Sequence, residues 1–395
     1  MSTTVQRVAQ SVPEVGERAV IERTCARCVM DTTAADIRFD QHGICNYCTT
    51  YLRNRERLAS GANKHEKLKL VIDKIRRDGR GKRYDCVIGV SGGADSTYVA
   101  YVVRSLELRP LAVHLDNGWD SELAVANIEN TMKRMGIDLY THVLDWNEFK
   151  DLQRSFLFAS TPDTELPTDH AIRTVLLQTA CEMNVGYILN GRNFSTEGIL
   201  PIDWSYGPFD WKYLKNVHRR FGKVPLRTYP HLTLASLFYH YIVRGIKDIN
   251  ILNMVDYRKQ EAMEVLKKEL GWRDYGGKHH ESTFTKFYQA HILPVKFNID
   301  KRKAHYSVLV ASGQMTRREA LEALKQPPYL TNELTEHKRF FAKKLDLSEE
   351  DFDRIMTARR RSYKDYPNRS SVFVPDASNP YGKVFRLARS MRGPS

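Results

Sequence analysis

The sequence predicts an α/β protein with a doubly wound parallel sheet, a four-cysteine knuckle before it and a mainly helical region after it. Short apolar segments alternate with helix-like segments between residues 84 and 190. Two C-x₂-C pairs precede them, and helical patterns dominate beyond residue 200. Strands of a parallel sheet form continuous apolar runs because helices cover both faces. We therefore expect a ligand crevice at the carboxyl ends of the strands.

Four strands and four helices account for the alternating region. The predicted strands are the apolar, β-branched runs at 84–90, 110–116, 139–145 and 187–190. The predicted helices cover 96–107, 121–136, 147–159 and 169–185, where apolar residues recur at helical spacing. No internal repeat is evident.

The chain is basic, with 61 Lys and Arg against 47 Asp and Glu and a net charge of +14. This charge suits nucleotides, nucleotide-sugars, RNA or an acidic membrane surface, or it reflects only a basic exterior. No run approaches the about 18 apolar residues of a transmembrane helix. The N-terminus has no apolar signal segment, so we expect a cytoplasmic protein. The tail "KVFRLARSMR" (383–392) is a candidate contact for a membrane or a partner, or a solvated terminal helix.

A glycine-rich turn, "VSGGADS" (90–96), separates the first predicted strand from its helix. Glycines allow positive φ and close approach of a ligand to the backbone. The following helix directs its unpaired N–H groups and the positive end of its dipole at that ligand. Ser91 and Ser96 add hydroxyl donors, and Asp95 either holds Mg²⁺ or fixes the loop. The pattern predicts a phosphate site.

The order of residues in this turn separates it from other phosphate loops. No Lys follows the glycines, and the glycines are adjacent, so the turn is neither G-x-x-x-x-G-K-[ST] nor G-x-G-x-x-G. S-G-G-x-D-S resembles the pyrophosphate loop of the ATP pyrophosphatase (PP-loop) superfamily, which has an adenine nucleotide alpha hydrolase-like fold. A lone S-G-G in an ordinary turn is the alternative. The resemblance implies that ATP is cleaved between the α- and β-phosphates, and it implies an ATP site formed by Val90, Ser91, Gly92, Gly93, Asp95, Ser96, Leu115, Asp116, Asn117, Gly191 and Arg192.

The four N-terminal cysteines have the spacing of a metal site. Cys25 and Cys28 form one C-x₂-C pair, and Cys45 and Cys48 form the other. This spacing predicts a closed, structural zinc site. Two disulfides are not expected in a chain that is not exported, and an iron–sulfur cluster is the remaining alternative. The other two cysteines, at 86 and 181, are predicted to be small buried apolar residues.

Three longer segments add a second resemblance. With the cysteine knuckle, "GRNFSTEG" (191–198), "GWRDYGGKHHESTFTKFYQAHILPVKF" (271–297) and "DKRKAHYSVLVASGQMTRREAL" (300–321) resemble the N-acetyl sugar amidotransferases of WbpG/PseA type, from about Cys25 to Asn368. That family acts in lipopolysaccharide O-antigen and surface-polysaccharide biosynthesis. The resemblance implies an ATP-dependent, AMP-forming ligase that converts an acetamido group of a nucleotide-activated sugar into an acetamidino group.

The resemblance also implies cofactors and partners. ATP, Mg²⁺ and a structural Zn²⁺ are the expected cofactors. Ammonia would come from a separate glutaminase (HisH-like) with a cyclase-like (HisF-like) subunit, and nucleic acid is not an expected partner. The chain agrees in having no obvious glutaminase domain.

The chemistry of an amide oxygen suggests roles for individual residues. Adenylation turns this poor leaving group into AMP, and ammonia then displaces AMP. Pyrophosphate must be neutralised as it departs, which requires Mg²⁺, backbone donors and cations. The catalytic candidates are Asp95, Ser96, the cations Lys286, Lys301 and Arg302, and Glu197, which would orient ammonia or accept its proton. A solvated basic face is the alternative for each cation.

Sugar recognition has candidates that follow the fourth strand and a second glycine pair. They are Asn193, Lys278, His279 and Glu281, and for the last three a satisfied polar turn is equally consistent with the sequence. Adjacent histidines do not have the spacing of a helical metal pair, so no second metal is predicted. Trp204, Tyr206 and Trp211 either stack on a sugar or base, or pack in the core.

Two other functions fit parts of the pattern. Enzymes that form 2-thiouridine in tRNA also place a zinc knuckle before a PP-loop domain. They use further catalytic cysteines, and here only Cys86 and Cys181 remain, which disfavours sulfur transfer. A non-catalytic nucleotide-binding scaffold is disfavoured by the complete loop.

These inferences divide the chain into six parts. We predict a disordered arm (1–22), a zinc-binding knuckle (23–50), a helical connector (51–82), a PP-loop ATP-binding core (83–200), a mainly helical substrate-binding region (201–370) and a basic tail (371–395).

Overall fold

The computed structural model describes residues 23–59, 64–276, 281–329 and 331–373, and the arm and most of the basic tail lie outside this part. The described residues form a five-stranded parallel sheet in the order β3-β2-β1-β4-β5. The strands are β1 (Cys86–Gly89), β2 (Pro110–Asp116), β3 (Asp138–Val143), β4 (Tyr187–Asn190) and β5 (Lys247–Asn250). Because the order reverses between β1 and β4, the ligand crevice is expected beside β1. The predicted doubly wound α/β class is confirmed.

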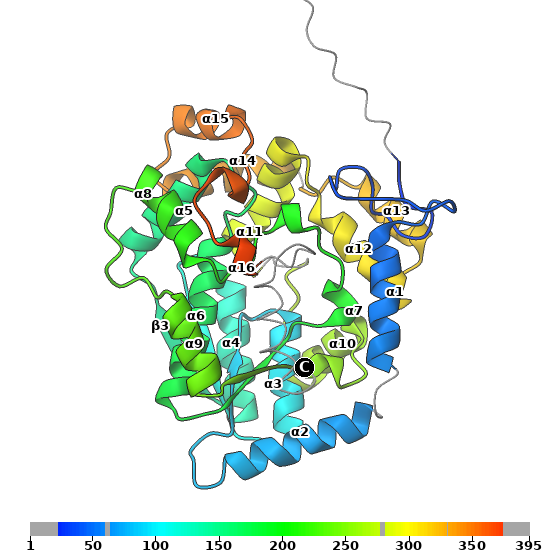
Figure 1. Cartoon of the computed structure of the whole chain (residues 1–395), viewed down its shortest axis with the longest axis vertical. Coiled ribbons are helices and arrows are strands. Elements are labelled where there is room, and N and C mark those ends of the chain that lie inside the picture. The colour runs from blue at the N-terminus through cyan, green and yellow to red at the C-terminus, as the bar shows by residue number, and fades with distance from the viewer. Residues whose placement is uncertain (1–22, 60–63, 277–280, 330, 374–395) are drawn as a thin grey trace, which may run out of the picture.

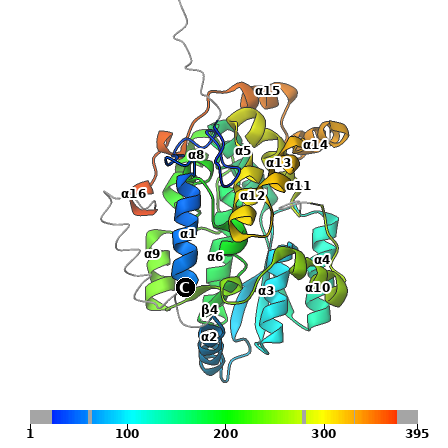
Figure 2. The same cartoon turned by 90° about the vertical axis from the view of Figure 1, so that its right-hand side faces the viewer.

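Helices cover both faces of the sheet (Figures 1 and 2). Cys86 and Ile88 of β1 face one core with α3 (Ala94–Ser105), α4 (Glu122–Met135) and α10 (Lys259–Leu270). Val87, between them, faces the opposite core with α6 (Leu166–Glu182). Side chains of a strand alternate between faces, so one short apolar run supplies both cores.

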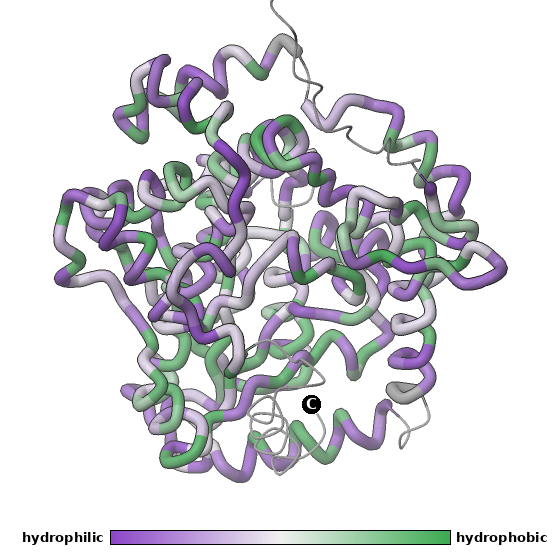
Figure 3. Tube along the Cα trace, turned by 45° about the horizontal axis from the view of Figure 1, so that its top comes forward, coloured by the Kyte–Doolittle hydropathy of each residue, from purple (hydrophilic) through white to green (hydrophobic). Residues whose placement is uncertain are grey.

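The remaining helices precede the sheet, connect its later strands or follow it in sequence. Apolar and polar residues alternate along most helices in Figure 3, as expected for amphipathic helices around a core. No helix in the described ranges combines the length and apolar composition needed to cross a bilayer. The bounds are α1 (Asn46–Ala59), α2 (Lys64–Asp78), α5 (Trp146–Ala159), α7 (Phe194–Glu197), η1 (Ile202–Trp204), α8 (Trp211–Phe221), α9 (Leu234–Phe238), η2 (Tyr239–Val243), η3 (Ile251–Asn253), α11 (Thr283–Phe287), η4 (Tyr288–Phe297), α12 (Lys301–Ser312), α13 (Arg317–Lys325), α14 (Thr331–Lys344), α15 (Glu349–Thr357), η5 (Tyr363–Asp365) and α16 (Ser370–Phe373).

Strand β5 is the element that the sequence pattern missed. Its sequence, KDIN, contains a single apolar residue, and it follows residue 200, where helices were expected. Asp248 on this strand is paired with Arg173 of α6 and accepts a hydrogen bond of 2.7 Å from Tyr241 Oη. These partners satisfy a polar side chain beside a core. The domain boundaries stay predictions. The sheet nevertheless includes β5, which lies beyond residue 200, the predicted end of the ATP-binding core.

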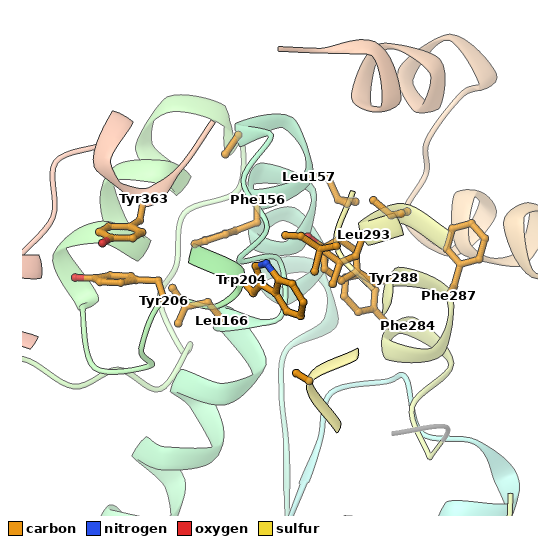
Figure 4. Packing of buried hydrophobic residues seen from close by; sticks show 14 of the residues in the cluster. Phe156, Leu157, Leu166, Trp204, Tyr206, Phe284, Phe287, Tyr288, Leu293 and Tyr363 are labelled. Atoms are coloured by element: carbon orange, nitrogen blue, oxygen red, sulfur yellow. The ribbon is translucent and has the colours of Figure 1, made fainter. Parts of the chain in front are cut away.

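A third core joins the cysteine knuckle and α5 to the C-terminal helices and contains two of the aromatic candidates. Trp204 and Tyr206 are each 2% exposed, and Tyr206 stacks on Tyr363 with 4.3 Å between ring centroids (Figure 4). Core packing, not ligand stacking, therefore accounts for these two residues. Trp211 is half-buried and stacks on His231 at 4.3 Å.

His170 in α6 gives a prediction about acid stability. Its Nδ1 lies 2.6 Å from the carbonyl oxygen of Pro208, and its Nε2 accepts from the amide of Leu232 at 3.0 Å. These contacts fit the neutral ring, and burial lowers the pKa of His170 from 6.5 to about 4. The folded state is therefore penalised as pH falls from 6.5 towards 4, by up to about 3 kcal/mol. When the free energy of unfolding is measured with urea at a series of pH values, it should fall less steeply towards acid pH in His170→Gln than in the wild type.

The exposed His42 provides the control for this measurement. His42→Gln is expected to leave the pH profile unchanged. An unaltered acid loss in His170→Gln would contradict the assignment.

Candidate active site and metal site

The turn from β1 into α3 has the geometry of an anion site. Gly92 has φ +77°, and a Cβ there would lie 2.7 Å from the carbonyl oxygen of Ala124. Gly93 is the N-cap of α3, with extended backbone. The start of α3 therefore lies at the carboxyl edge of the sheet, where the N-terminus of a helix favours an anion. Only glycine fits position 92 without displacing α4.

Two hydroxyls shape this turn. Ser96 Oγ accepts from the amide of Ser91 at 3.2 Å and donates to the carbonyl of Gly93 at 3.1 Å. The amide of Gly93 donates to Ser91 Oγ at 3.3 Å. Both predicted hydroxyl residues thus lie at the loop, 3.2 Å apart.

Three aromatic side chains donate hydrogen bonds to the loop, and the sequence pattern predicts no role for them. Trp272 Nε1 and Tyr275 Oη both donate to the carbonyl of Gly92, at 2.8 and 3.0 Å. Tyr257 Oη donates to Asp95. Burial, and then the charge of Asp95, raise the pKa of Tyr257, which therefore remains a donor. Trp272 and Tyr275 occur in the quoted segment 271–297, whereas nothing local singles out Tyr257.

His114 adds a titratable group beneath the loop. Its Nδ1 lies 3.0 Å from the carbonyl of Val90, and its Nε2 lies 3.2 Å from Asp120 Oδ2. Burial opposes protonation, but the carboxylate of Asp120 and the Val90 carbonyl outweigh it and raise the pKa of His114. A protonated imidazole here would favour an anion at the turn.

Acidic candidates gather around the same turn. The amide of Ser121 donates to the carbonyl of Glu281 at 2.8 Å, which anchors this residue after β2. Glu281 Oε1 comes within 3.4 Å of the Cβ position at Gly93. Burial has the largest effect on the pKa of Tyr257, followed by Asp95. The negative charge of Glu197 raises this pKa further, so Glu197 lies near Tyr257. Lys278 and His279 lie outside the described residues.

The loops after β2 and β4 reach the same edge. A Cβ at Gly191 would lie 3.2 Å from the backbone carbonyl of Asp95, so the loop after β4 packs directly on the start of α3. After β2, Asp116 Oδ1 accepts from the amide of Gly118 at 2.8 Å, and Asn117 Nδ2 donates to Thr168 Oγ1 at 3.2 Å. The loop after β4 thus lies against the turn, and a cleft shared with the loop after β2 stays a prediction.

Several predicted residues have structural partners. Asn193 is 4% exposed and caps α7 by accepting from the amide of Thr196 at 2.8 Å. The side chain of Val90 is buried, so only its backbone could face a ligand. Leu115 is half-buried and Arg192 is exposed. The ligand roles of these residues remain predictions.

The three cation candidates are ion-paired. Lys286 Nζ bonds Glu333 at 2.8 Å, and Lys301 Nζ bonds Glu165 at 2.7 Å. Arg302 bonds both carboxylate oxygens of Asp300, its own helix cap. Each would have to share or exchange its carboxylate to neutralise pyrophosphate, so this role also remains a prediction.

The four N-terminal cysteines form the predicted tetrad. Their sulfurs all lie within 4.8 Å of one another, with Cys25–Cys48 at 4.0 Å and Cys28–Cys45 at 3.7 Å. A tetrahedron with Zn–S bonds of about 2.3 Å has edges of about 3.8 Å. These separations fit Zn²⁺ and exceed a disulfide bond of about 2.05 Å. Amides also point at the sulfurs, including that of Cys45 to Cys25 Sγ at 3.2 Å. The donor set therefore fits a structural zinc.

The knuckle is docked on the C-terminal region (Figure 1). The Arg317 guanidinium of α13 donates to the carbonyls of Cys25 and Cys28 at 3.0–3.2 Å. The amide of Val29 donates to Ser307 Oγ of α12 at 3.2 Å. The metal site and α12–α13 are thus one structural unit.

Comparison with solved structures found proteins of low similarity. A predicted subunit of tRNA methyltransferase from Methanocaldococcus jannaschii is 14% identical, with a TM-score of 0.27, over 46% of this chain and 75% of that chain. NH3-dependent NAD synthetase from Campylobacter jejuni is 15% identical, with a TM-score of 0.27, over 52% and 82%. NMN synthetase from Francisella tularensis is 13% identical, with a TM-score of 0.28, over 66% and 97%. Similarity at this level supports no inference about the reaction.

Comparison with sequences and protein families gave one informative result. No curated protein sequence matched the chain. Residues 281–377 matched the family profile described as LPS biosynthesis protein WbpG-like, C-terminal domain. This range begins at Glu281 beside the glycine turn and includes the helices on which the knuckle docks. Residues 281–377 are therefore similar to the C-terminal domain of WbpG-like LPS biosynthesis proteins, in agreement with the resemblance seen in the sequence.

Proposed function

We propose that this chain is an ATP-dependent amidotransferase that converts an acetamido group of a nucleotide-activated sugar into an acetamidino group. The amide oxygen attacks the α-phosphate of ATP, forming an O-adenylyl imidate and releasing pyrophosphate. Ammonia from a partner glutaminase adds to the imidate carbon, AMP leaves with the oxygen, and one proton is lost. The net change is replacement of O by NH.

The observation that carries this proposal is the Ser91–Ser96 turn together with the WbpG-like domain. The turn presents amides of α3 at the carboxyl edge of β1, and Gly92 has no room for a side chain. Such a site suits the leaving pyrophosphate, because preorganised donors are most effective where charge develops. Glu281, the first residue of the matched domain, lies against this turn.

Magnesium fits the acids at the turn. Mg²⁺ is commonly held by one or two carboxylates together with phosphate oxygens. Asp95 and Glu281 are the carboxylates that would hold it, and the ion would stabilise charge on the departing pyrophosphate. Lys286, Lys301 and Arg302 remain the proposed cations of the C-terminal half, and Glu197 the proposed group for orienting ammonia.

Sulfur transfer to tRNA is the less favoured alternative. Cys86 is fully buried in β1, and burial raises the pKa of its thiol, so it is a poor nucleophile. Cys181 lies in α6, outside the four-cysteine cluster. No observation on the described residues favours a sulfur carrier.

A direct assay tests the proposal. The chain is incubated with ATP, Mg²⁺, ammonium and a panel of nucleotide-linked diacetamido sugars. AMP and pyrophosphate should form in equal amounts, with a sugar product lighter by the difference between O and NH. Accumulation of ADP, or thiolated tRNA in a parallel reaction with a sulfur donor, would refute it.

Substitution of Gly92 tests the turn itself. Gly92→Ala adds a Cβ 2.7 Å from a backbone oxygen at φ +77°. We expect ATP affinity, measured by calorimetry, to fall about tenfold or more, since donors at the turn are displaced. Gly136→Ala is the matched control, with φ +62° and nothing within 4 Å of the new Cβ. It should cost about 1 kcal/mol of unfolding free energy and leave ATP binding unchanged. Equal ATP affinity in both variants would exclude the turn as the nucleotide site.

A further inference from the structure

The position of Glu197, the group proposed to orient ammonia, depends on how the short helix α7 is held. Glu197 is the last residue of this four-residue helix, which follows the loop after β4. A single helical turn is not stable by itself in water, because nucleating a helix costs more than so few hydrogen bonds return. Contacts from other parts of the chain must therefore fix α7 in place.

Tyr51 of α1 makes the first of these contacts. Helix α1 begins inside the second C-x₂-C pair, so it leaves directly from the cysteine knuckle, and Figure 1 shows it beside α7. The ring of Tyr51 stacks on that of Phe194, with 4.2 Å between centroids and 10° between planes. A Cβ at Gly198 would lie 2.8 Å from Cε2 of Tyr51. The buried ring of Tyr51 thus contacts the first residue of α7 and the residue directly after Glu197.

Gln314, just after α12, makes the second contact. Its Nε2 donates to the carbonyl of Ser195 in α7 at 3.1 Å, and its Oε1 accepts from the amide of Lys259 at 3.2 Å. Lys259 lies two residues after Tyr257, whose hydroxyl bonds the carboxylate of the glycine turn. One side-chain amide therefore joins the segments that carry Glu197 and Tyr257.

The helices that supply these two side chains are themselves connected. Arg55 Nη1 of α1 donates to the carbonyl of Ala311 in α12 at 3.3 Å. The knuckle also bonds α12 through the amide of Val29 and Ser307 Oγ. Gln314 lies within the range of the WbpG-like profile, which begins at residue 281. The knuckle and the WbpG-like region thus meet at α7.

We propose that Tyr51 and Gln314 are positioning residues that hold Glu197 where ammonia attacks the adenylated substrate. This inference rests on the proposed function and gives the knuckle a part in the reaction in addition to folding. Tyr51 contacts α7 at both ends, so its loss should affect the use of ammonia and spare ATP binding at the turn. Gln314 also supports the segment of Tyr257, so its loss should affect the use of both ammonia and Mg²⁺.

Steady-state kinetics with ammonium as the varied substrate test Tyr51. In Tyr51→Leu we expect the KM for ammonium to rise about tenfold or more, since small displacements of a positioned group are costly. The Kd of ATP, measured by calorimetry, should stay unchanged. Tyr51→Phe keeps the stacking ring and should restore the KM of the wild type. A KM for ammonium that is unchanged in Tyr51→Leu, or a fall in ATP affinity as large as the rise in KM, would overturn the proposal.

Gly198→Ala tests the same contact from the side of α7. The added Cβ would lie 2.8 Å from the Tyr51 ring, so the ring or α7 must move, and the KM for ammonium should rise as in Tyr51→Leu. Gly207→Ala is the matched control, because nothing lies within 4 Å of its Cβ. Equal KM values in the two alanine variants would contradict the role of Tyr51.

Gln314→Met tests the second contact, because it keeps the length of the side chain and removes both hydrogen bonds. We expect a higher KM for ammonium and a higher Mg²⁺ concentration for half-maximal release of pyrophosphate. The control is Gln41→Met, at an exposed position of the knuckle, which should change neither value. Wild-type values of both quantities in Gln314→Met would refute the role of Gln314.

Hydrogen exchange separates failure of this inference from failure of the proposed function. Amides of residues 194–198 should exchange faster in Gln314→Met than in the wild type, with zinc content and the free energy of global unfolding unchanged. An active wild type whose variants keep both slow exchange and the KM for ammonium would refute the positioning role alone. A wild type that forms no AMP with any sugar would refute the proposed function and the ammonia role of Glu197. Unchanged exchange in Gln314→Met would then also refute the support of α7.

Discussion

Asp95→Asn is expected to reduce pyrophosphate release by about a hundredfold or more while the fold stays intact. The substitution removes the charge proposed to hold Mg²⁺ and keeps the shape of the side chain. The amide oxygen can still accept from Tyr257, which preserves the contact between α3 and the segment before α10. Release is measured with an enzyme-coupled pyrophosphate assay, and folding by urea unfolding.

Two further variants are compared with Asp95→Asn, one that alters the position of the carboxylate and one that serves as a control. Tyr257→Phe removes the donor to Asp95 and should raise the Mg²⁺ concentration needed for half-maximal release, since Tyr257 positions the carboxylate. Asp138→Asn, at the opposite end of the sheet on β3, should leave the rate unchanged. Unchanged turnover in Asp95→Asn would contradict the assignment of this turn.

Cys48→Ser is expected to abolish zinc binding and lower the free energy of unfolding by about 3 kcal/mol or more, because structural zinc contributes directly to folding. The loss should extend beyond the knuckle. Arg317 and Ser307 bond the backbone of the knuckle, so amide protection should fall in α12 and α13 as well as in residues 23–59. Elemental analysis and hydrogen exchange measure the two effects.

Matched substitutions separate metal binding from docking. Cys181→Ser changes a cysteine outside the tetrad and should keep the zinc content of the wild type. Arg317→Ala removes the donors to the Cys25 and Cys28 carbonyls and should keep zinc but lose protection in α13. Unaltered zinc in Cys48→Ser would disprove the tetrad.

The local features of this protein could be predicted from its sequence. The strands β1 to β4 are short runs rich in apolar residues, and the glycine turn and the paired cysteines each lie within a few dozen residues. Their conformations follow from backbone sterics, side-chain alternation and ligand spacing. Such effects act between near neighbours in the chain.

The partners of these features were decided only in the tertiary structure. Trp272 and Tyr275 donate hydrogen bonds to the carbonyl of Gly92, although they lie 180 and 183 positions away from it in the sequence. Arg317 reaches the knuckle across 292 positions, and β5 enters the sheet through β4 and the Arg173–Asp248 pair. The ion pairs of Lys286 and Lys301 likewise depend on distant helices. A hydrogen bond or ion pair between remote segments leaves no period or spacing in the sequence, because only folding brings its two groups into contact.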